Sequence, residues 1–170
     1  TPNVFKENPG KGMPKRTFKD KLTIGVGADQ INLYYFGPAH TGGDAVVTFE
    51  RANVVHMGDL MFNRRHPVVD RPSGASLNNW VTVLNRTIAA HDNETVYIFG
   101  HAGGTFPVTG TRTHLAKMGQ YLTALVGYAA GLKKSGRSRE EVTAITAPLP
   151  GFAEHGPLTP AILGAAFDET

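Results

Sequence analysis

The sequence contains no cysteine, which excludes disulfide bonds and thiolate zinc sites and leaves histidine and carboxylate as the strong metal ligands available. It also lacks any apolar run near the roughly 20 residues that a membrane-spanning helix needs, so we expect no membrane partner. The 170 residues are 41% hydrophobic and 18% charged, a composition typical of folded globular chains and not of disordered ones. We therefore expect a single folded domain.

The excess of basic over acidic residues is small, 17 against 14. Basic residues are scattered, and the densest group, within residues 6–21, is interrupted by Glu7 and Asp20. This pattern is more typical of a solvated surface than of a patch that binds a polyanion. We therefore expect no nucleic-acid partner.

Residues 1–20 are rich in proline, glycine and lysine and show no regular period. They predict an extended N-terminal segment ahead of a folded unit over residues 21–170. The chain begins at Thr1, without an initiator methionine or a signal-peptide pattern, as expected of a trimmed or cleaved product. The sequence does not determine the cellular location, and a periplasmic or secreted location would suit a processed N-terminus.

Short β-prone runs dominate the first half of the chain. Residues 22–26 and 30–36 flank a Gly-Ala-Asp turn, which is typical of a hairpin. Residues 44–50 and 53–57 form a second pair around another short turn. We therefore expect mostly antiparallel strands in this half.

The second half is predicted to be mainly helical. Apolar residues recur at helical spacing after Ser76, a good N-cap, until Asp92 ends the run. The compact apolar run over 95–99 predicts a buried strand. Three more helices are predicted after it, over 111–134, from 138 and over 158–167, and the helix from 138 opens with a capping box.

Strands followed by helices predict an α+β fold with a mixed or antiparallel sheet and helices on one of its faces. The strands expected at 53–57 and 95–99 are apolar on both sides. The face opposite the helices would therefore stay exposed unless another sheet covers it. The sequence thus predicts one half of a sandwich.

Three short segments after expected strands place glycine beside a potential metal ligand. They contain His40 (GPAHTGGD), Asp59 (GD) and His101 (GHAGG). Glycine permits a sharp turn and leaves room for an ion, and loops at strand ends are where binding groups converge. Any one of these residues could be an ordinary turn or exposed residue, but the repeated pattern favours a shared site. Two imidazoles and a carboxylate suit zinc, iron or manganese.

The same motifs resemble, in order and spacing, those of the metallo-β-lactamase superfamily over about residues 20–135. The resemblance implies the C-terminal half of an αββα sandwich in a metal-dependent hydrolase. It implies that His40 binds a first metal, that Asp59 bridges two ions and has the catalytic role, and that His101 binds the second. The cofactors would be two divalent ions, zinc first, with iron or manganese as alternatives.

Other residues receive supporting roles. Thr41 and Asp44 are implied to orient the first histidine loop without binding metal. Arg64, Arg65 and His66 are candidates for contacts with a small-molecule substrate, although exposed arginines are usually just solvated. The remaining histidines are isolated and are expected to be structural or exposed; they are His56, His91, His114 and His155.

The family's His-x-His-x-Asp-His run is missing from this sequence. That run supplies most of the remaining ligands from the N-terminal half of the sandwich, so the chain by itself is expected to bind metal weakly at most. An aspartate at position 59 resembles the hydrolase branches more than the dedicated β-lactamases. Phe62 stands where some β-lactamases carry a lysine that grips the substrate.

Two hypotheses follow for function. In the first, the chain is part of a dinuclear metallohydrolase that cleaves an ester, thioester, lactone or amide bond with a metal-bound hydroxide. Its partner would be the missing N-terminal half. In the second, it is a non-catalytic half-domain that pairs sheet to sheet with a second copy and carries a weak or empty metal site.

Overall fold

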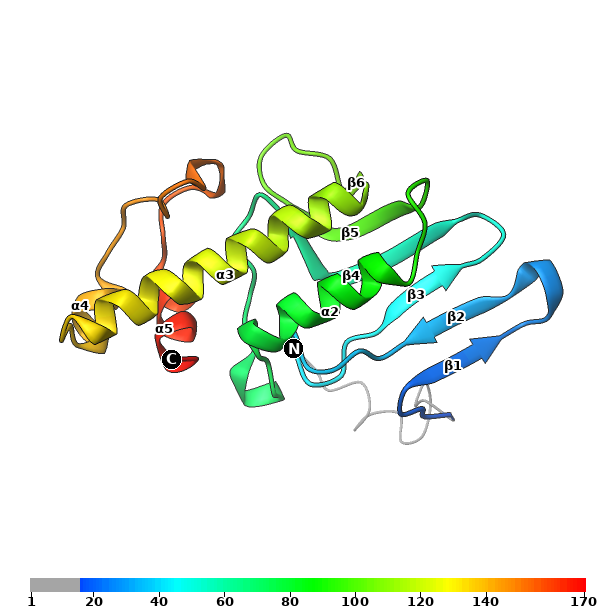
Figure 1. Cartoon of the computed structure of the whole chain (residues 1–170), viewed down its shortest axis with the longest axis horizontal. Helices are drawn as coiled ribbons and strands as arrows, with labels where there is room; N and C mark the ends of the chain where they lie inside the picture. The colour runs from blue at the N-terminus through cyan, green and yellow to red at the C-terminus, as the bar shows by residue number, and fades with distance from the viewer. Residues whose placement is uncertain (1–15) are drawn as a thin grey trace, which may run out of the picture.

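A mixed sheet forms the centre of the fold (Figure 1). The computed structural model describes residues 16–170, so most of the predicted extended segment lies outside the described residues. Neighbouring strands pair in chain order and are antiparallel, except that β4 and β5 are parallel. The strands are β1 (Lys21–Ile24), β2 (Ile31–Tyr34), β3 (Val46–Phe49), β4 (Val54–Asn63), β5 (Val96–Ala102) and β6 (Thr109–Gly110).

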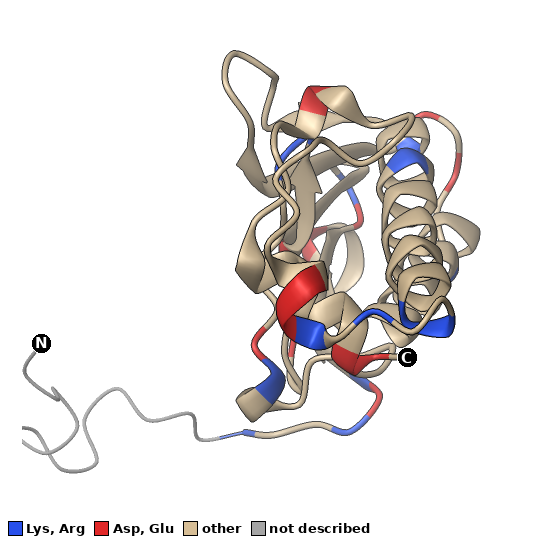
Figure 2. Cartoon of the chain, turned by 90° about the vertical axis from the view of Figure 1, so that its left-hand side faces the viewer, with Lys and Arg blue, Asp and Glu red and all other residues tan. Residues whose placement is uncertain are grey.

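Helices lie on one face of this sheet, as Figure 2 shows in a view turned by 90°. The predicted α+β fold, with a mixed sheet and helices on one face, is therefore confirmed. Local capping explains where several helices begin, since Ser76, Ser138 and Thr159 each accept a backbone N–H. The helices are α2 (Leu77–Ala89), α3 (Arg112–Lys134), α4 (Arg139–Thr143) and α5 (Pro160–Asp168), with single turns η1 (Gly27–Asp29), η2 (Arg71–Ser73) and η3 (Ala153–His155).

The hydrophobic core lies between the sheet and helices α2 and α3. Val55 and Tyr97 are fully buried on the helix-facing side of β4 and β5. Trp80 of α2 is also fully buried, and its indole N–H donates to the backbone oxygen of Leu60 at 2.9 Å. This hydrogen bond satisfies the polar atom of a large core side chain and ties α2 to β4.

Strand β4 is longer than the sequence predicted. The expected strand ended at Met57, whereas pairing with β5 continues to Asn63 past an irregularity between Gly58 and Phe62. Gly58 takes a positive φ of 50°, which glycine adopts without strain and which lets the chain bulge and resume pairing. Asp59 therefore lies within a strand and not in a loop after it.

The opposite face of the sheet consists of two rows of mainly apolar side chains. Among residues 16–170 no element covers this face, and Ile24, Phe49 and Val96 are 46%, 37% and 44% exposed. An apolar surface of this kind is unusual on a protein that does not use it for contact. By strand register the rows are Leu22, Leu33, Val47, His56 and Ile98, then Ile24, Ile31, Phe49, Val54 and Val96.

The C-terminal helices pack against the far end of α3 (Figure 1). Glu169 accepts hydrogen bonds from the Ser76 hydroxyl at 2.7 Å and from the Asn78 N–H at 3.0 Å, and it also pairs with Arg71. Burial by itself raises the pKa of Glu169, but these hydrogen bonds outweigh it and lower the pKa overall. No described helix is long and apolar enough to cross a membrane.

Candidate metal centre

His40, Asp59 and His101 meet near the end of the parallel pair β4 and β5. The Nε2 atom of His40 lies 3.9 Å from Oδ2 of Asp59, and the Nε2 atom of His101 lies 3.2 Å from Oδ1. Each imidazole therefore faces a different oxygen of one carboxylate. The structure thus brings together all three ligands that the sequence predicted.

The strands set the position of Asp59 and His101. Phe62 of β4 pairs with His101 of β5, and their rings stack with centroids 4.6 Å apart. Phe62 is also 6.2 Å from the ring of His40. The resemblance singled out position 62 only because some β-lactamases carry a lysine there, whereas the structure places the Phe62 ring beside both imidazoles.

Gly100 provides the space that Asp59 occupies. A Cβ atom at position 100 would lie 2.5 Å from both Oδ1 of Asp59 and the backbone oxygen of Gly58. Carbon and oxygen atoms cannot approach so closely, so any side chain here would move the carboxylate or part the two strands.

We expect Gly100→Ala to lower the free energy of unfolding by about 1–3 kcal/mol, as overpacking of a tight site does. Urea unfolding of the chain measures this effect. The matched control is Gly127→Ala in α3, where nothing lies within 4 Å of the added Cβ. That change should stabilise the helix by about 0.5–1 kcal/mol. Equal stability of the two variants would contradict the role given to Gly100.

The loop that carries His40 is ordered by Asp44. Oδ2 of Asp44 accepts hydrogen bonds from the backbone N–H of Thr41 at 2.6 Å and from its hydroxyl at 2.9 Å. Oδ1 lies 3.2 Å from Nδ1 of His40. Because a carboxylate only accepts, the proton of a neutral His40 belongs on Nδ1, which leaves the Nε2 lone pair facing Asp59.

The same loop is fastened to the start of α2. Ser76 donates its N–H to the Ala39 oxygen at 3.0 Å, and the Asn79 amide donates to the Pro38 oxygen at 2.7 Å. Since Glu169 caps this end of α2, the chain's C-terminal residues help to hold the first histidine in place. No sequence pattern pointed to that contact.

The donor set fits divalent metal ions. In the described part of the chain, no three His, Asp or Glu side chains converge on one point that an ion could fill. Instead, each oxygen of the Asp59 carboxylate lies within ion-pair distance of one imidazole, 3.9 Å from His40 and 3.2 Å from His101. Imidazole and carboxylate are ligands that divalent transition metals accept, and an ion held here would need further ligands.

The three candidate substrate contacts have partners other than the predicted metal ligands. Nδ1 of His66 lies 2.7 Å from the Tyr121 hydroxyl, and its Nε2 lies 2.9 Å from the Pro157 oxygen. Arg65 lines the same pocket as His66, and Arg64 lies over the ring of Phe106. Among residues 16–170, no hydrogen bond or ion pair joins them to the three predicted ligands.

His155 completes the cluster around His66. Its ring stacks on Tyr121 with centroids 4.1 Å apart. Burial lowers the pKa of His155 and raises the pKa of Tyr121 far above its ordinary value. Both side chains therefore stay neutral near pH 7, as suits a packing role that fastens the segment after α4 to α3.

The chain is similar to known metallo-beta-lactamases. The family model described as Metallo-beta-lactamase superfamily matches residues 3–101, more than half of the chain. A metallo-beta-lactamase type 2 of Bacteroides fragilis is 24% identical over 105 residues, which cover 61% of this chain and 42% of that protein. The metallo-beta-lactamase IND-1 of Chryseobacterium indologenes is 24% identical over 99 residues, covering 58% and 41%. The chain thus spans only part of the length of these relatives.

Solved structures share the fold. The metallo-beta-lactamase from Pontibacter korlensis matches with a TM-score of 0.55 at 23% identity, covering 71% of this chain and 53% of that chain. The inverting sec-alkylsulfatase Pisa1 from Pseudomonas sp. matches with a TM-score of 0.64 at 18% identity, covering 89% and 26%. Identities this low establish the fold alone.

Proposed function

The chain belongs to the metallo-β-lactamase superfamily, and on that basis we propose that it forms part of a hydrolase in which His40, Asp59 and His101 hold two divalent ions. Members of this superfamily are metal-dependent hydrolases. The observation that carries the proposal is the convergence of two imidazoles on the two oxygens of one carboxylate, at 3.9 and 3.2 Å. We infer zinc as the metal, with iron or manganese as alternatives suited to the same ligands.

The residues of this chain would hold and orient the centre. When bound, the ions would activate water and polarise the bond to be cleaved in an ester, thioester, lactone or amide. Asp44 keeps the proton of His40 on Nδ1 and so presents Nε2 to the site. Phe62 shields the inner side of both imidazoles from water. Arg64, Arg65 and His66 stay candidates for contact with an anionic substrate.

The apolar sheet face supports a second part of the proposal. We infer that the N-terminal half of the same fold covers this face and supplies the remaining metal ligands. The two rows of apolar side chains, which no described element covers, are what a second sheet would pack on. The alternative occupant is a second copy of this chain, which would bury the same rows without completing the metal centre.

Metal removal tests the proposed function. The complete protein should contain about two divalent ions per molecule, and chelation should lower its hydrolysis of a simple thioester or ester at least about tenfold. Zinc should restore the rate, while magnesium, which prefers oxygen ligands, serves as the control ion. Metal content near zero, with hydrolysis unchanged by chelation and by His40→Ala, would overturn the proposal.

A further inference from the structure

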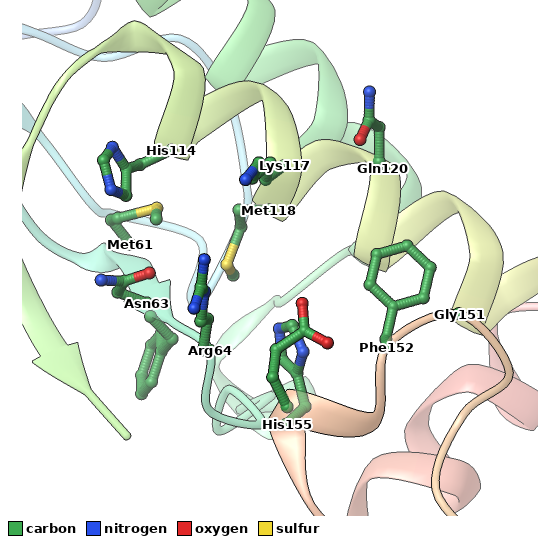
Figure 3. Close-up of a pocket in the computed structure, with 12 residues that line it drawn as sticks. Met61, Asn63, Arg64, His114, Lys117, Met118, Gln120, Gly151, Phe152 and His155 are labelled. Carbon is green, nitrogen blue, oxygen red and sulfur yellow. The ribbon is translucent and has the colours of Figure 1, made fainter. Parts of the chain in front are cut away.

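A cavity of about 230 Å³ lies between the end of β4, the first half of α3 and the turn η3 (Figure 3). None of the three predicted metal ligands lines it. Phe62 is shared between the two sites, since its ring stacks on His101 and it also lines the cavity. The cavity is therefore a separate site, one aromatic side chain away from the candidate metal centre.

The cavity has a polar side with an excess of positive charge. Arg64 and Lys117 line it together with one acidic residue, Glu154. Among residues 16–170, neither Arg64 nor Lys117 has a carboxylate within ion-pair distance. Figure 3 shows Arg64 pointing from the end of β4 toward α3, which carries Lys117. Arg64, which follows β4, and Lys117 of α3 thus border one small space without an ion-pair partner among the described residues.

The position of Arg64 is held by its surroundings. Its φ of 52° lies in the left-handed region, which costs a non-glycine residue free energy and persists only when neighbouring contacts enforce it. The Gly103 N–H donates to the Asn63 oxygen at 2.9 Å, and the Asn63 amide donates to the Pro107 oxygen at 2.9 Å. The guanidinium lies 4.4 Å from the centre of the Phe106 ring. Arg64 is thus preorganised at the cavity.

The rest of the wall is mixed, with polar side chains from Asn63, His114, Gln120 and His155 beside an apolar group. Met61, Met118 and Phe152 belong to that group, and methionine side chains adapt readily to a bound apolar group. The volume is below the roughly 300–1,000 Å³ typical of sites for drug-sized ligands, so the occupant must be small. We propose that this cavity binds a small organic carboxylate, its charge between Arg64 and Lys117 and its apolar body against the methionines.

Carboxylate is the anion that these groups favour. The planar guanidinium presents parallel N–H donors that match the two oxygens of a carboxylate, and lysine adds a second charge. Inorganic sulfate or phosphate would pair with the two cations but would make no contact with the apolar side chains. A neutral alcohol would contact the apolar side chains but would leave the two cations without an anion. The ligand therefore needs both a carboxylate and an apolar body.

Methionine methyl NMR of the full 170-residue chain, kept free of metal by a chelator, tests this site with hexanoate as the probe. Met61 and Met118 line the cavity, whereas Met57 is buried on β4 and does not line it. We expect hexanoate to shift the Met61 and Met118 signals and to leave the Met57 signal in place. Hexanol and sulfate should shift them far less at equal concentration.

Two variants separate this site from general binding. Arg64→Gln and Lys117→Gln should each weaken hexanoate binding about tenfold, because each removes a charge-assisted hydrogen bond. Lys134→Gln, an exposed lysine near the end of the same helix, is the matched control and should bind as the wild type does. Lys117 is also exposed, so its variant should fold normally.

Several results would overturn the proposal. They are the absence of a hexanoate shift at Met61 and Met118, an equal shift with hexanol or with sulfate, and unchanged affinity in both cavity variants. Because the test measures binding to metal-free protein, its failure would leave the hydrolase proposal untouched. Failure of the metal-removal experiment would in turn say nothing about this cavity.

Discussion

Asp59→Asn in the complete protein is expected to lower kcat/KM by about a thousandfold, equivalent to roughly 4 kcal/mol of transition-state stabilisation. One carboxylate oxygen of Asp59 faces the imidazole of His40, and the other faces the imidazole of His101. Asparagine keeps the shape but removes the negative charge and turns one oxygen into an N–H donor. It therefore cannot be shared between two cations, and metal content should fall together with the rate.

Steady-state kinetics and elemental analysis of the same preparation measure both effects. Asp29→Asn is the matched control, since Asp29 lies on the exposed turn η1 and pairs only with Arg51 among the described residues. That variant should keep its activity and its metal. An Asp59→Asn protein that retained two ions and a near-normal rate would show that Asp59 does not bridge a metal centre.

Leu33→Lys is the second change with a large expected effect. Leu33 lies in the middle of one apolar row, paired with Leu22 on one side and Val47 on the other. If the N-terminal half of the fold covers this face, the lysine would be buried there. The complete protein should then lose at least about 3 kcal/mol of unfolding free energy, because an apolar contact is lost and a charge is desolvated.

In the 170-residue chain alone, the same substitution should leave folding intact and reduce self-association. Urea unfolding of the complete protein and analytical ultracentrifugation of the isolated chain measure the two effects. Val26→Lys is the control, because Val26 is already 86% exposed and lies outside the rows. A stable complete protein with Leu33→Lys, combined with a chain that changes from dimer to monomer, would favour the second copy as the natural occupant.

Local patterns in the sequence predicted a large share of this molecule. Helix α3 covers Arg112–Lys134, close to the predicted 111–134, because apolar residues at helical spacing are a local signal. The three predicted ligands were recognised through glycine-flanked motifs that are short and contiguous. The apolar character of both faces of β4 and β5 predicted the uncovered sheet face in the same local way.

The extent of the strands was harder to predict from sequence. The Gly-Asp motif reads as the end of a strand, yet β4 continues to Asn63 because β5 supplies hydrogen-bonding partners beyond the irregularity at Gly58. A strand's length depends on its neighbour, which lies about forty residues away in the sequence. Propensity within a short window contains no information about that partner.

By itself, the sequence determined which side chains are able to bind metal and which faces of the strands are apolar, since both are properties of residue type and near spacing. Only the tertiary structure decided that Glu169 caps α2 beside the His40 loop, that His66 packs on Tyr121, and that Arg64 borders a cavity with Lys117. These contacts join segments far apart along the chain. They exist because packing of the whole fold brings the segments together, and no local sequence pattern encodes that proximity.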